Sequence, residues 1–457
     1  MRAGLKLLCT LCKNQILTYP PDKLKLPRHL KVFGTICGII FYPKGLFIRP
    51  DKTYGERFSN CLYALGSIYI KFGQTLSTRP DLIGAEMAES LRYLQDRLPP
   101  FDSAIVIERI ETQFGKKISE LFDEFEEKPV AAASIAQVHK ARLKSGELVA
   151  VKILRPDIAK KYNDDIDFLE YCAALITKMV KSSKRLKLTE VIGIFRRSME
   201  FELDLRSEAA AASRIADNFT GDDSLCVPKI HWNLTTNDII TLEWIDGVSI
   251  YDKEAIIALG HDPKEIAAKI AVIFFNQAYR DGFFHADLHP GNIFVCKDGR
   301  VALVDFGIVG ILPENDRLAI AEILFAFLNR DYALIAKVHH RIGYIPSDTN
   351  LEYFAQSCRA IAEPIIGLAI KEVSIARLLS HLFKVTEDFG METQPQLLLL
   401  QKTMVVVEGI GQSLDEDINM WQLAEPWIKK WAAKNITPEA KILRAVKKII
   451  NDLLDRA

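Results

Sequence analysis

The 457-residue chain lacks any apolar run long enough to cross a bilayer, which takes about 18 to 20 continuous apolar residues. Its longest apolar stretches, residues 32–42 and 397–407, are too short or are interrupted by polar residues, so we expect no transmembrane helix. A secretory cleavage pattern is also absent, and residues 1–50 contain no serine. We therefore expect a cytoplasmic protein with neither a signal peptide nor a transit peptide.

An excess of charge of either sign is lacking too, because 59 Lys and Arg residues balance 59 Asp and Glu residues. No nucleic-acid-binding motif is present, so nucleic acid is not expected as a partner. The eight cysteines stand at irregular positions and indicate a reducing compartment rather than a disulfide framework. Cys9 and Cys12 form a Cys-x-x-Cys pair, but no second pair or histidine cluster follows at zinc-ligand spacing. A zinc site is therefore not expected.

Hydrophobic residues make up 49% of the chain, enough to bury a large core in more than one lobe or domain. Charge is unevenly distributed, since residues 1–50 carry nine Lys or Arg residues and a single acidic residue, Asp22. A basic segment rich in apolar residues favours contact with an anionic membrane surface. A packed helical extension with a solvated basic face is an equally good interpretation. The apolar residues in question are Phe33, Ile39, Ile40, Phe41 and Tyr42.

Residues 283–294, FFHADLHPGNIF, and residues 303–307, LVDFG, contain three side chains at the spacing of protein kinases. Asp287 takes the place of the catalytic base, Asn292 that of one Mg²⁺ ligand, and Asp305 that of another. Charge on a transferring phosphoryl group spreads over its oxygens, so two carboxylates and an amide suit Mg²⁺-dependent chemistry. Either motif alone is most often a loop or a turn, whereas the two in this order indicate an active site.

The nucleotide lysine of such a site is expected upstream on a strand. Residues 149–156, VAVKILRP, supply Lys152 on an alternating β-branched run that predicts a strand. In the kinase signature this lysine binds the α- and β-phosphates. A lone lysine on a strand is more often a solvated edge residue. The distance in sequence to Asp287 nevertheless suits a small lobe for nucleotide contacts and a larger lobe for the catalytic loop.

Residues 129–141, PVAAASIAQVHKA, stand where a kinase has its glycine-rich phosphate loop, but glycine is absent. Glycine reaches positive φ and lets backbone N–H groups approach phosphate oxygens, which alanine largely cannot do. We therefore expect a stiffer loop that grips phosphates differently. The alternative is a helical turn of closely packed small residues. The candidate phosphate contacts are Ala131, Ala132, Ala133 and Ser134.

Together these motifs resemble the UbiB-type atypical kinases, a protein-kinase-like family associated with ubiquinone biosynthesis. The resemblance spans roughly residues 55–415. Residues 70–84, IKFGQTLSTRPDLIG, contain the family's Lys-x-Gly-Gln signature, and residues 201–212, FELDLRSEAAAA, are similar to its Glu-x-Asp element. The signature residues are Lys71, Gly73 and Gln74 in the first stretch and Glu202 and Asp204 in the second.

The resemblance implies that Glu208 is the helix glutamate that holds Lys152. Spacing alone also offers Glu170, which follows Lys152 much more closely in sequence. With Glu208 as the partner, a helix predicted at about residues 157–181 becomes an insertion relative to ordinary kinases.

The resemblance also implies that Glu202 and Asp204 meet Lys71 and dock the N-terminal helices over the active site. On helices, Lys71 and Gln74 would share one face, and Asp204 and Glu208 another. Two carboxylates at that spacing repel each other unless a cation lies close by. A helix that presents Lys71 and Gln74 there would obstruct a peptide substrate and supply its own contacts to nucleotide.

Two absences agree with a non-peptide substrate. Ala286 stands where the usual catalytic loop has an arginine that reads activation-loop phosphate. After Asp305 the chain runs through residues 307–317 into a predicted helix without an Ala-Pro-Glu element. Regulation by phosphorylation of such a loop is therefore not expected.

Residues 238–250, DIITLEWIDGVSI, are typical of a strand that ends in a connector, where a kinase hinge would lie. Backbone near Glu243, Trp244 and Ile245 could contact adenine, and an ordinary strand and turn is the alternative. Downstream of residue 312, apolar spacing predicts helices within three ranges. Many family members end in hydrophobic spans, but residues 442–457 are typical of an amphipathic helix, so we expect peripheral contact with the inner membrane. The three helical ranges are 315–343, 351–390 and 395–413.

We predict an α+β, atypical protein-kinase-like bilobal fold with an N-terminal helical extension and a helical C-terminal lobe. The resemblance implies an atypical kinase or ATPase that binds ATP or ADP with Mg²⁺ and supports isoprenoid quinone biosynthesis or lipid metabolism. The predicted parts are a basic segment at 1–50, a helical extension with Lys-x-Gly-Gln at 51–125, a kinase-like N-lobe with a helical insertion at 126–245, and a helical C-lobe with its extension at 246–457.

The expected partners are a nucleotide, a quinone-related lipid or the proteins that make it, and a membrane surface. Three alternatives stay open: a conventional protein kinase, a small-molecule kinase of aminoglycoside type, and a non-catalytic nucleotide-gated scaffold or lipid chaperone. The candidate residues are Asp287, Lys152, Lys71 and Gln74 for catalysis, Ala131, Ala132, Ala133, Ser134, Lys152, Glu208, Glu202 and Asp204 for nucleotide binding, and Asn292 and Asp305 for metal.

Overall fold

The structure is a computed structural model that describes residues 2–19, 28–43, 50–77, 83, 85–92, 94, 99–179, 188–366, 389, 394–416, 418, 426–427 and 429–431. The chain divides into two compact units. The first comprises Met1–Ala209 and Ile230–Trp244, and the second comprises Ala210–Lys229 and Ile245–Ala457. Residues 210–229, which lie within the range predicted for the N-lobe, belong to the second unit.

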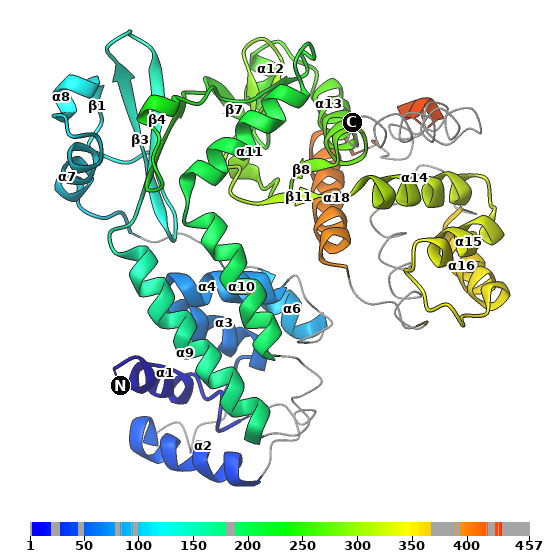
Figure 1. Cartoon of the computed structure of the whole chain (residues 1–457), viewed down its shortest axis with the longest axis horizontal. Helices are drawn as coiled ribbons and strands as arrows, with labels where there is room; N and C mark the ends of the chain where they lie inside the picture. Colours follow the sequence, from blue (N-terminus) through cyan, green and yellow to red (C-terminus); the bar gives the residue numbers. More distant parts are fainter. Residues whose placement is uncertain are drawn as a thin grey trace, which may run out of the picture. The chain divides into compact units, whose positions relative to one another are not determined.

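The first unit contains a five-stranded antiparallel sheet (Figure 1). The strand predicted around Lys152 is β4, which lies inside this sheet with a neighbour on each side. Four strands follow the order β1 (Phe122–Phe125), β3 (Ala136–Leu143), β4 (Leu148–Leu154) and β6 (Ile239–Glu243), and β2 (Ala131–Ala132) pairs with β3.

Alternation along β4 explains which face each side chain takes. Val149, Val151 and Ile153 are buried on one face, where α7 (Ser103–Phe114) and α8 (Ile118–Leu121) pack. Because successive side chains point to opposite faces of a strand, Lys152 lies on the other face. Leu205, at the start of α11 (Leu205–Asn218), is buried together with Leu154 of β4 on that second face.

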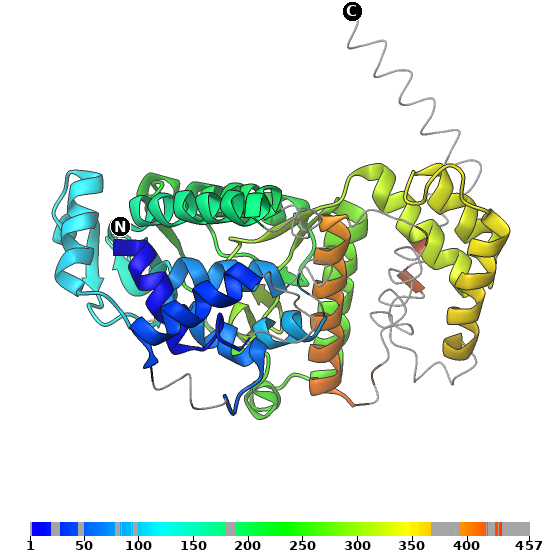
Figure 2. The same ribbon diagram turned by 90° about the horizontal axis from the view of Figure 1, so that it is seen from below.

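The first unit also contains helices that pack outside the sheet. The predicted helix with the Lys-x-Gly-Gln signature is α4, and the predicted insertion is α9, which lies beside α10 in Figures 1 and 2. Ile68 of α4 is buried among Tyr162 and Ile166 of α9 and Phe195 of α10. The helices are α1 (Arg2–Lys13), α2 (Arg28–Phe41), α3 (Tyr54–Leu65), α4 (Ser67–Ser77), α6 (Ala85–Arg92), α9 (Ile158–Met179) and α10 (Leu188–Glu202).

Gly73 lets α4 pack closely against its neighbours. A Cβ added at Gly73 would lie 2.4 Å from Leu94 Cδ1 and 2.6 Å from Leu62 Cδ1, distances that real carbon atoms do not adopt. Leu62 and Leu94 are both buried in the core of these helices. Packing therefore favours glycine at this position of the signature, since any side chain would have to displace the ends of two buried leucines.

The segment that carries the Glu-x-Asp element breaks where a continuous helix was expected. Helix α10 ends at Glu202 and α11 begins at Leu205. Asp204 precedes α11, and its Oδ1 accepts a hydrogen bond of 3.1 Å from the backbone N–H of Arg206. Aspartate is a preferred residue at this N-terminal position because it satisfies a backbone donor of the first turn. The prediction that Asp204 and Glu208 share a helix face is therefore wrong.

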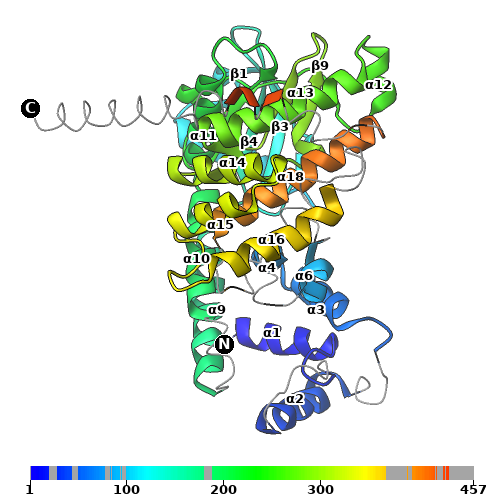
Figure 3. The ribbon, with the colours of Figure 1, turned by 90° about the vertical axis from the view of Figure 1, so that its right-hand side faces the viewer.

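The second unit combines short strands with packed helices, and α18 lies beside α13 (Figures 1 and 3). Its strands are β5 (Leu225–Cys226), β10 (Val301–Leu303), β9 (Ile293–Cys296) and β7 (Gly247–Ser249) in sheet order, with a pair formed by β11 (Val309–Ile311) and β8 (Phe283–His285). Its helices are α12 (Lys253–Ala258), α13 (Pro263–Phe275), α14 (Glu314–Leu328), α15 (Tyr332–Arg341), α16 (Leu351–Ile366) and α18 (Pro395–Leu414).

The helices predicted downstream of residue 312 are present where the structure describes the chain. Residues 315–343 form α14 and α15, which are separated by Arg330 in a left-handed conformation and by Asp331, whose side chain caps α15. Residues 367–388, most of the rest of the second predicted range, and residues 442–457 lie outside the described residues. Among the helices that are described, none is long and apolar enough to cross a membrane.

Candidate active site

Lys152 and Glu208 form a buried ion pair in the first unit. The Lys152 Nζ donates to both Glu208 carboxylate oxygens, at 2.9 and 3.0 Å, and the two side chains are only 12% and 5% exposed. Buried charges are tolerated when they are paired and hydrogen-bonded. Glu170, the partner that spacing alone offered, instead accepts a hydrogen bond of 2.9 Å from Arg196.

The alanine-rich loop is a strand and a tight turn, so the alternative of a helical turn is wrong. Ala131 and Ala132 form β2 and pair with Val138 and Gln137 of β3. The Ala133 N–H donates to the Ala136 carbonyl at 2.8 Å, which closes the turn.

A side chain from outside the loop also holds this turn. The Arg155 guanidinium donates to the Ala133 carbonyl at 2.9 Å and to the Pro99 carbonyl at 2.8 Å. Ser134 is fully buried, and its hydroxyl has no hydrogen-bond partner among the residues that the structure describes. A pairing strand and a guanidinium clamp agree with a stiff loop.

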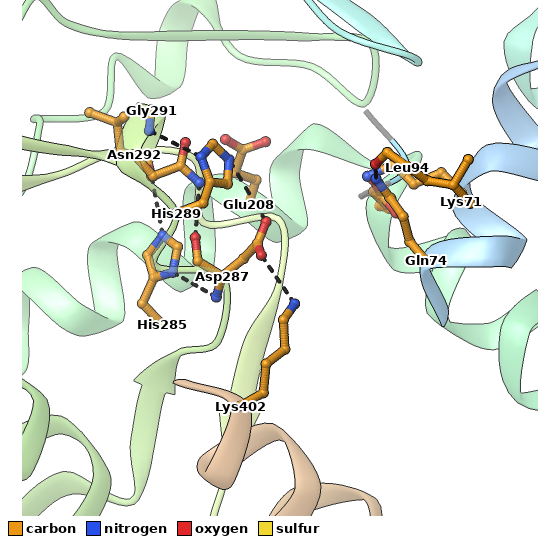
Figure 4. Close-up of polar contacts among 12 residues, drawn as sticks. Lys71, Gln74, Leu94, Glu208, His285, Asp287, His289, Gly291, Asn292 and Lys402 are labelled. Carbon is orange, nitrogen blue, oxygen red and sulfur yellow. Dashed lines mark hydrogen bonds and ion pairs between the residues drawn. The ribbon is translucent and has the colours of Figure 1, made fainter. Parts of the chain in front are cut away.

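The Lys71 Nζ lies 2.5 Å from a Glu202 carboxylate oxygen, and both side chains are about one-seventh exposed. Asp204 binds Arg206 through both carboxylate oxygens, at 2.9 and 2.7 Å, and these hydrogen bonds hold the pKa of the Asp204 carboxyl below its usual value. The expected contact with Lys71 is therefore made by Glu202, while Asp204 pairs with a neighbouring arginine. The Gln74 amide donates to the Leu94 carbonyl at 3.1 Å (Figure 4).

The candidate hinge is a strand and connector, as expected, but one of its donors is already used. β6 ends at Glu243, and the Trp244 N–H donates to the Leu148 carbonyl at 3.0 Å. The Lys140 Nζ lies over the face of the Trp244 ring, 4.9 Å from its centroid. An adenine contact through the Trp244 N–H would therefore have to displace a sheet hydrogen bond.

In the second unit, His285 organises the catalytic loop. The Asp287 N–H donates to His285 Nδ1 at 3.1 Å, which assigns the ring proton to Nε2, and Nε2 donates to the Val304 carbonyl at 3.1 Å. Burial lowers the pKa of His285 below its usual value, so the imidazole is neutral. The His285 ring also lies 5.2 Å from that of Phe306 in the Asp-Phe-Gly motif. One neutral ring thus joins the two motif-bearing segments.

The chain immediately before β8 also supports this loop. Asn276–Asp281 form a π-helical turn, an uncommon structure that often marks functional sites. It aims the buried Gln277 side chain at the loop, where Gln277 Oε1 accepts a hydrogen bond of 2.9 Å from the His285 N–H.

Two side chains face the Asp287 carboxylate (Figure 4). Lys402 Nζ lies 3.3 Å from Oδ1, and His289 Nε2 lies 4.0 Å from Oδ2. His289 Nδ1 accepts from the Gly291 N–H at 3.0 Å, so in the neutral ring the proton is on Nε2 and points toward the carboxylate. His289 therefore structures the loop.

Asn292 and Asp305 have the chemistry and placement of Mg²⁺ ligands. The Asn292 amide nitrogen donates to the Asp287 carbonyl at 3.1 Å, which leaves its oxygen as the available ligand atom. The Val304 N–H donates to the Asn292 carbonyl at 3.0 Å, so the backbone places Asp305 next to Asn292. Mg²⁺ usually takes one or two protein oxygens together with phosphates and waters. These two oxygen donors fit that pattern.

Asp305 adopts an uncommon backbone conformation, with φ of 62°. This left-handed region is costly for most side chains, and Asp and Asn tolerate it best. An exposed aspartate held there, two residues after the end of β10, is the kind of strained residue that accumulates at functional sites.

Within the described part of the chain, no group of three or more His, Cys, Asp or Glu residues is arranged to hold a metal ion. All eight cysteines are free thiols. Burial raises the pKa of the Cys12 thiol to about 11, which opposes the thiolate form that zinc requires.

Sequence reasoning missed three residues that hold the site residues: Arg155, Gln277 and Lys402. Arg155 and Gln277 carry no signal that a single sequence reveals. Lys402 did carry one, because it is the sole basic residue within the mostly apolar residues 395–414.

A buried strand lysine with a helix glutamate, together with an Asp-x₄-Asn loop paired to Asp-Phe-Gly, defines a kinase-like protein, and the alanine-rich loop marks it as atypical. A family model described as the ABC1 atypical kinase-like domain matches residues 93–339. A second model, the UbiB helical domain, matches residues 358–419.

Two relatives carry the name of this family. The Probable protein kinase UbiB of Marinobacter nauticus is 40% identical over 435 residues, which cover 94% of this chain and 78% of that protein. The Probable protein kinase UbiB of Shewanella piezotolerans is 41% identical over 413 residues, covering 89% and 75%. Among solved structures, the complex of Rv3197 with erythromycin from Mycobacterium tuberculosis is 26% identical with a TM-score of 0.49, covering 77% of this chain and 90% of that chain. The chain belongs to the UbiB family of atypical kinase-like proteins, and the predicted bilobal α+β fold is confirmed.

Proposed function

We propose that the protein binds a Mg²⁺-nucleotide, with ATP as the expected form, and transfers or hydrolyses its terminal phosphoryl group. The observation that carries the proposal is the buried Lys152–Glu208 pair in one unit and the ordered Asp287–Asn292 loop in the other. In kinases, groups equivalent to these act on a single nucleotide. A protein that served only as a lipid-binding scaffold would have no need for a base, two metal ligands and a phosphate lysine.

Each residue has a distinct role in this proposal. Lys152 binds the α- and β-phosphates, and Glu208 keeps its ammonium group in place. Asn292 and Asp305 hold Mg²⁺, which when bound neutralises phosphate charge and orients the terminal phosphoryl group. Asp287 orients the attacking hydroxyl or water and accepts its proton.

The proposed acceptor is water or a small isoprenoid quinone precursor with a phenolic hydroxyl, in support of ubiquinone biosynthesis. Relatives carry the name protein kinase, so a protein acceptor is the rival. Three features favour the small acceptor: the Ala-Pro-Glu element is missing, the short strand β11 and then α14 follow Asp305 directly, and Lys71 and Gln74 lie on a packed helix. We propose that this helix occupies the space that a peptide would need and contacts the nucleotide.

The deciding experiment is Mg²⁺-dependent ATP turnover by the purified full chain. It is run with water alone, with a prenylated phenol, and with a generic protein substrate, beside an Asp305→Asn variant. Turnover stimulated by the phenol and lost in Asp305→Asn supports the proposal. Labelled phosphate on protein serine would establish the protein-kinase alternative, and tight nucleotide binding without turnover would establish a nucleotide-gated scaffold.

We also propose that α2 docks on an anionic membrane surface. Its apolar side chains are about half exposed or more, and they recur at the three- and four-residue spacing of one helix face. Gly34, on the opposite side, packs against Leu17, because an added Cβ would lie 2.9 Å from the Leu17 carbonyl oxygen. The excess of Lys and Arg in residues 1–50 supplies the complementary charge for anionic lipid. The exposed side chains are Val32, Phe33, Ile36, Ile39 and Ile40.

Co-sedimentation with liposomes tests this surface. Ile36→Asp and Ile40→Asp together should reduce binding to vesicles of 30% anionic lipid by about tenfold or more, because each removes apolar burial and adds repulsion. Ile257→Asp on α12 is the matched control, since Ile257 is equally exposed at 55%. Equal loss of binding in the control would show that α2 is not the docking face.

A further inference from the structure

Lys402 occupies a fixed place on a helix that carries none of the kinase motifs. Helix α18 has no other basic residue. Its buried apolar residues recur every three or four positions, and the helix packs against α13 and β11. The position of Lys402 is therefore determined by the core of the second unit rather than by a surface loop. The buried residues are Leu397, Leu400, Met404, Val407, Ile410 and Leu414.

Lys402 forms an ion pair with the carboxylate of Asp287 in the catalytic loop. Its Nζ lies 3.3 Å from Asp287 Oδ1, across 115 residues of sequence. The backbone on both sides of the Asp287 side chain is fixed, because the Asp287 N–H donates to His285 and its carbonyl accepts from Asn292. Lys402 supplies the remaining contact, which sets the rotation of the carboxylate itself, with His289 near the second oxygen at 4.0 Å (Figure 4).

This ion pair is poorly placed to stabilise the fold. The Lys402 side chain is 43% exposed and that of Asp287 is 32% exposed. Ion pairs of that exposure contribute little to stability, because solvent screens them and ordering two side chains costs entropy. The contact made by Lys402 is better explained by the chemistry of the carboxylate that it faces.

We propose that Lys402 is a positioning residue for phosphoryl transfer, which acts through Asp287. This inference rests on the proposed function. Lys402 holds one carboxylate oxygen so that the other is directed at the attacking hydroxyl or water. The usual kinase arginine at position 286 is an alanine here, so the cation for this loop comes from α18.

The test compares Lys402→Met with the wild-type chain. Loss of a positioning contact should lower kcat for ATP turnover by about 10- to 100-fold and leave the Kd of a non-hydrolysable ATP analogue within about threefold, because Lys402 acts on the base and not on nucleotide binding. Lys402→Arg, which keeps a cation and a donor, should recover most of kcat.

A double-mutant cycle identifies the residue through which Lys402 acts. In an Asp287→Asn background, Lys402→Met should cause less than about a twofold further change in residual turnover. Lys264→Met is the matched control, since Lys264 pairs at 3.8 Å with Asp415 at the end of α18 and is 70% exposed; its kcat should equal that of the wild type.

Three results would overturn the inference alone: unchanged kcat in Lys402→Met, a rise in kcat that marks Lys402 as an inhibitory cap on the base, or fully additive effects in the cycle. Circular dichroism and the Kd of the ATP analogue verify that Lys402→Met is folded. If Lys402→Met is misfolded, Lys402→Arg decides the question, and an inactive Lys402→Arg would also reject the inference. Absence of turnover in the wild type with intact nucleotide binding would instead reject the proposed function, and this inference with it.

Discussion

Lys152 with Glu208 and Lys402 with Asp287 are both lysine–carboxylate pairs, one in each unit. The first pair is 12% and 5% exposed with atoms 2.9 Å apart, whereas the second is 43% and 32% exposed at 3.3 Å. A buried pair holds its geometry because separating the charges in a low-dielectric interior is costly. An exposed pair has no such constraint and depends on the hydrogen-bonded loop around it. Loss of charge should therefore damage stability in the first unit and activity in the second.

The largest expected effect on stability comes from breaking the buried pair. Glu208→Ala leaves the Lys152 ammonium buried without a counterion, and we expect the free energy of unfolding to fall by about 3–5 kcal/mol. Chemical denaturation measures this loss. The double variant Lys152→Met, Glu208→Leu should regain most of it while failing to bind ATP. If Glu208→Ala lowers the free energy of unfolding by less than about 1 kcal/mol, the buried pair is no more important for stability than the exposed one.

Acid should affect the second unit through a buried histidine. Burial lowers the pKa of His339 in α15 to about 4, below the value of about 6.5 in an unfolded chain. The folded state thus binds this proton less well than the unfolded state. The contribution of neutral His339 is complete above pH 6.5 and is lost as the pH falls toward 4, by at most about 3 kcal/mol. Hydrogen exchange of α15 against pH follows it, and His339→Phe should flatten the curve.

Overpacking at Gly73 in the first unit should lower stability by a smaller amount. Gly73→Ala places a methyl group against Leu62 and Leu94, and overpacking of this kind lowers stability by about 1–3 kcal/mol. Gly193→Ala in α10 is the control, because a Cβ there meets nothing within 4 Å. Thermal melting of both variants checks this prediction. If Gly193→Ala is destabilised as much as Gly73→Ala, the close approach at α4 does not explain the glycine.

Removing the charge of Lys402 should have the smallest effect on stability. Lys402→Met should change the free energy of unfolding by less than about 1 kcal/mol, since the pair is exposed. The same denaturation experiment as for Glu208→Ala applies. A loss as large as that of Glu208→Ala would mean that the exposed pair is structural after all.

The fold was predictable because its elements have strong local signals. The alternating run around Lys152 specifies β4, and apolar spacing at residues 395–413 specifies α18. The break before α11 was missed because Asp204 and Glu208 are spaced as on one helix face, and the four consecutive alanines after Glu208 also favour helix. The capping preference of Asp204 outweighs that local propensity.

The site was predictable only as residue types at fixed spacing. Asp287, Asn292 and Asp305 follow from a motif, yet nothing in the sequence gives the left-handed backbone of Asp305 or the tautomer of His285. The Lys402 contact joins residues 115 positions apart. Such a contact depends on tertiary packing, which a local pattern does not encode. The functional roles of these residues stay predictions.

The break between α10 and α11 means that residues 202–208 are constrained in length as well as in identity. Glu202, Asp204 and Glu208 each meet a different cation, Lys71, Arg206 and Lys152. One inserted or deleted residue would turn the following helix by about 100° and shift it by about 1.5 Å. Glu208 would then point away from β4. Related chains should therefore vary in length at exposed turns such as residues 144–146, while the spacing between these three carboxylates stays fixed.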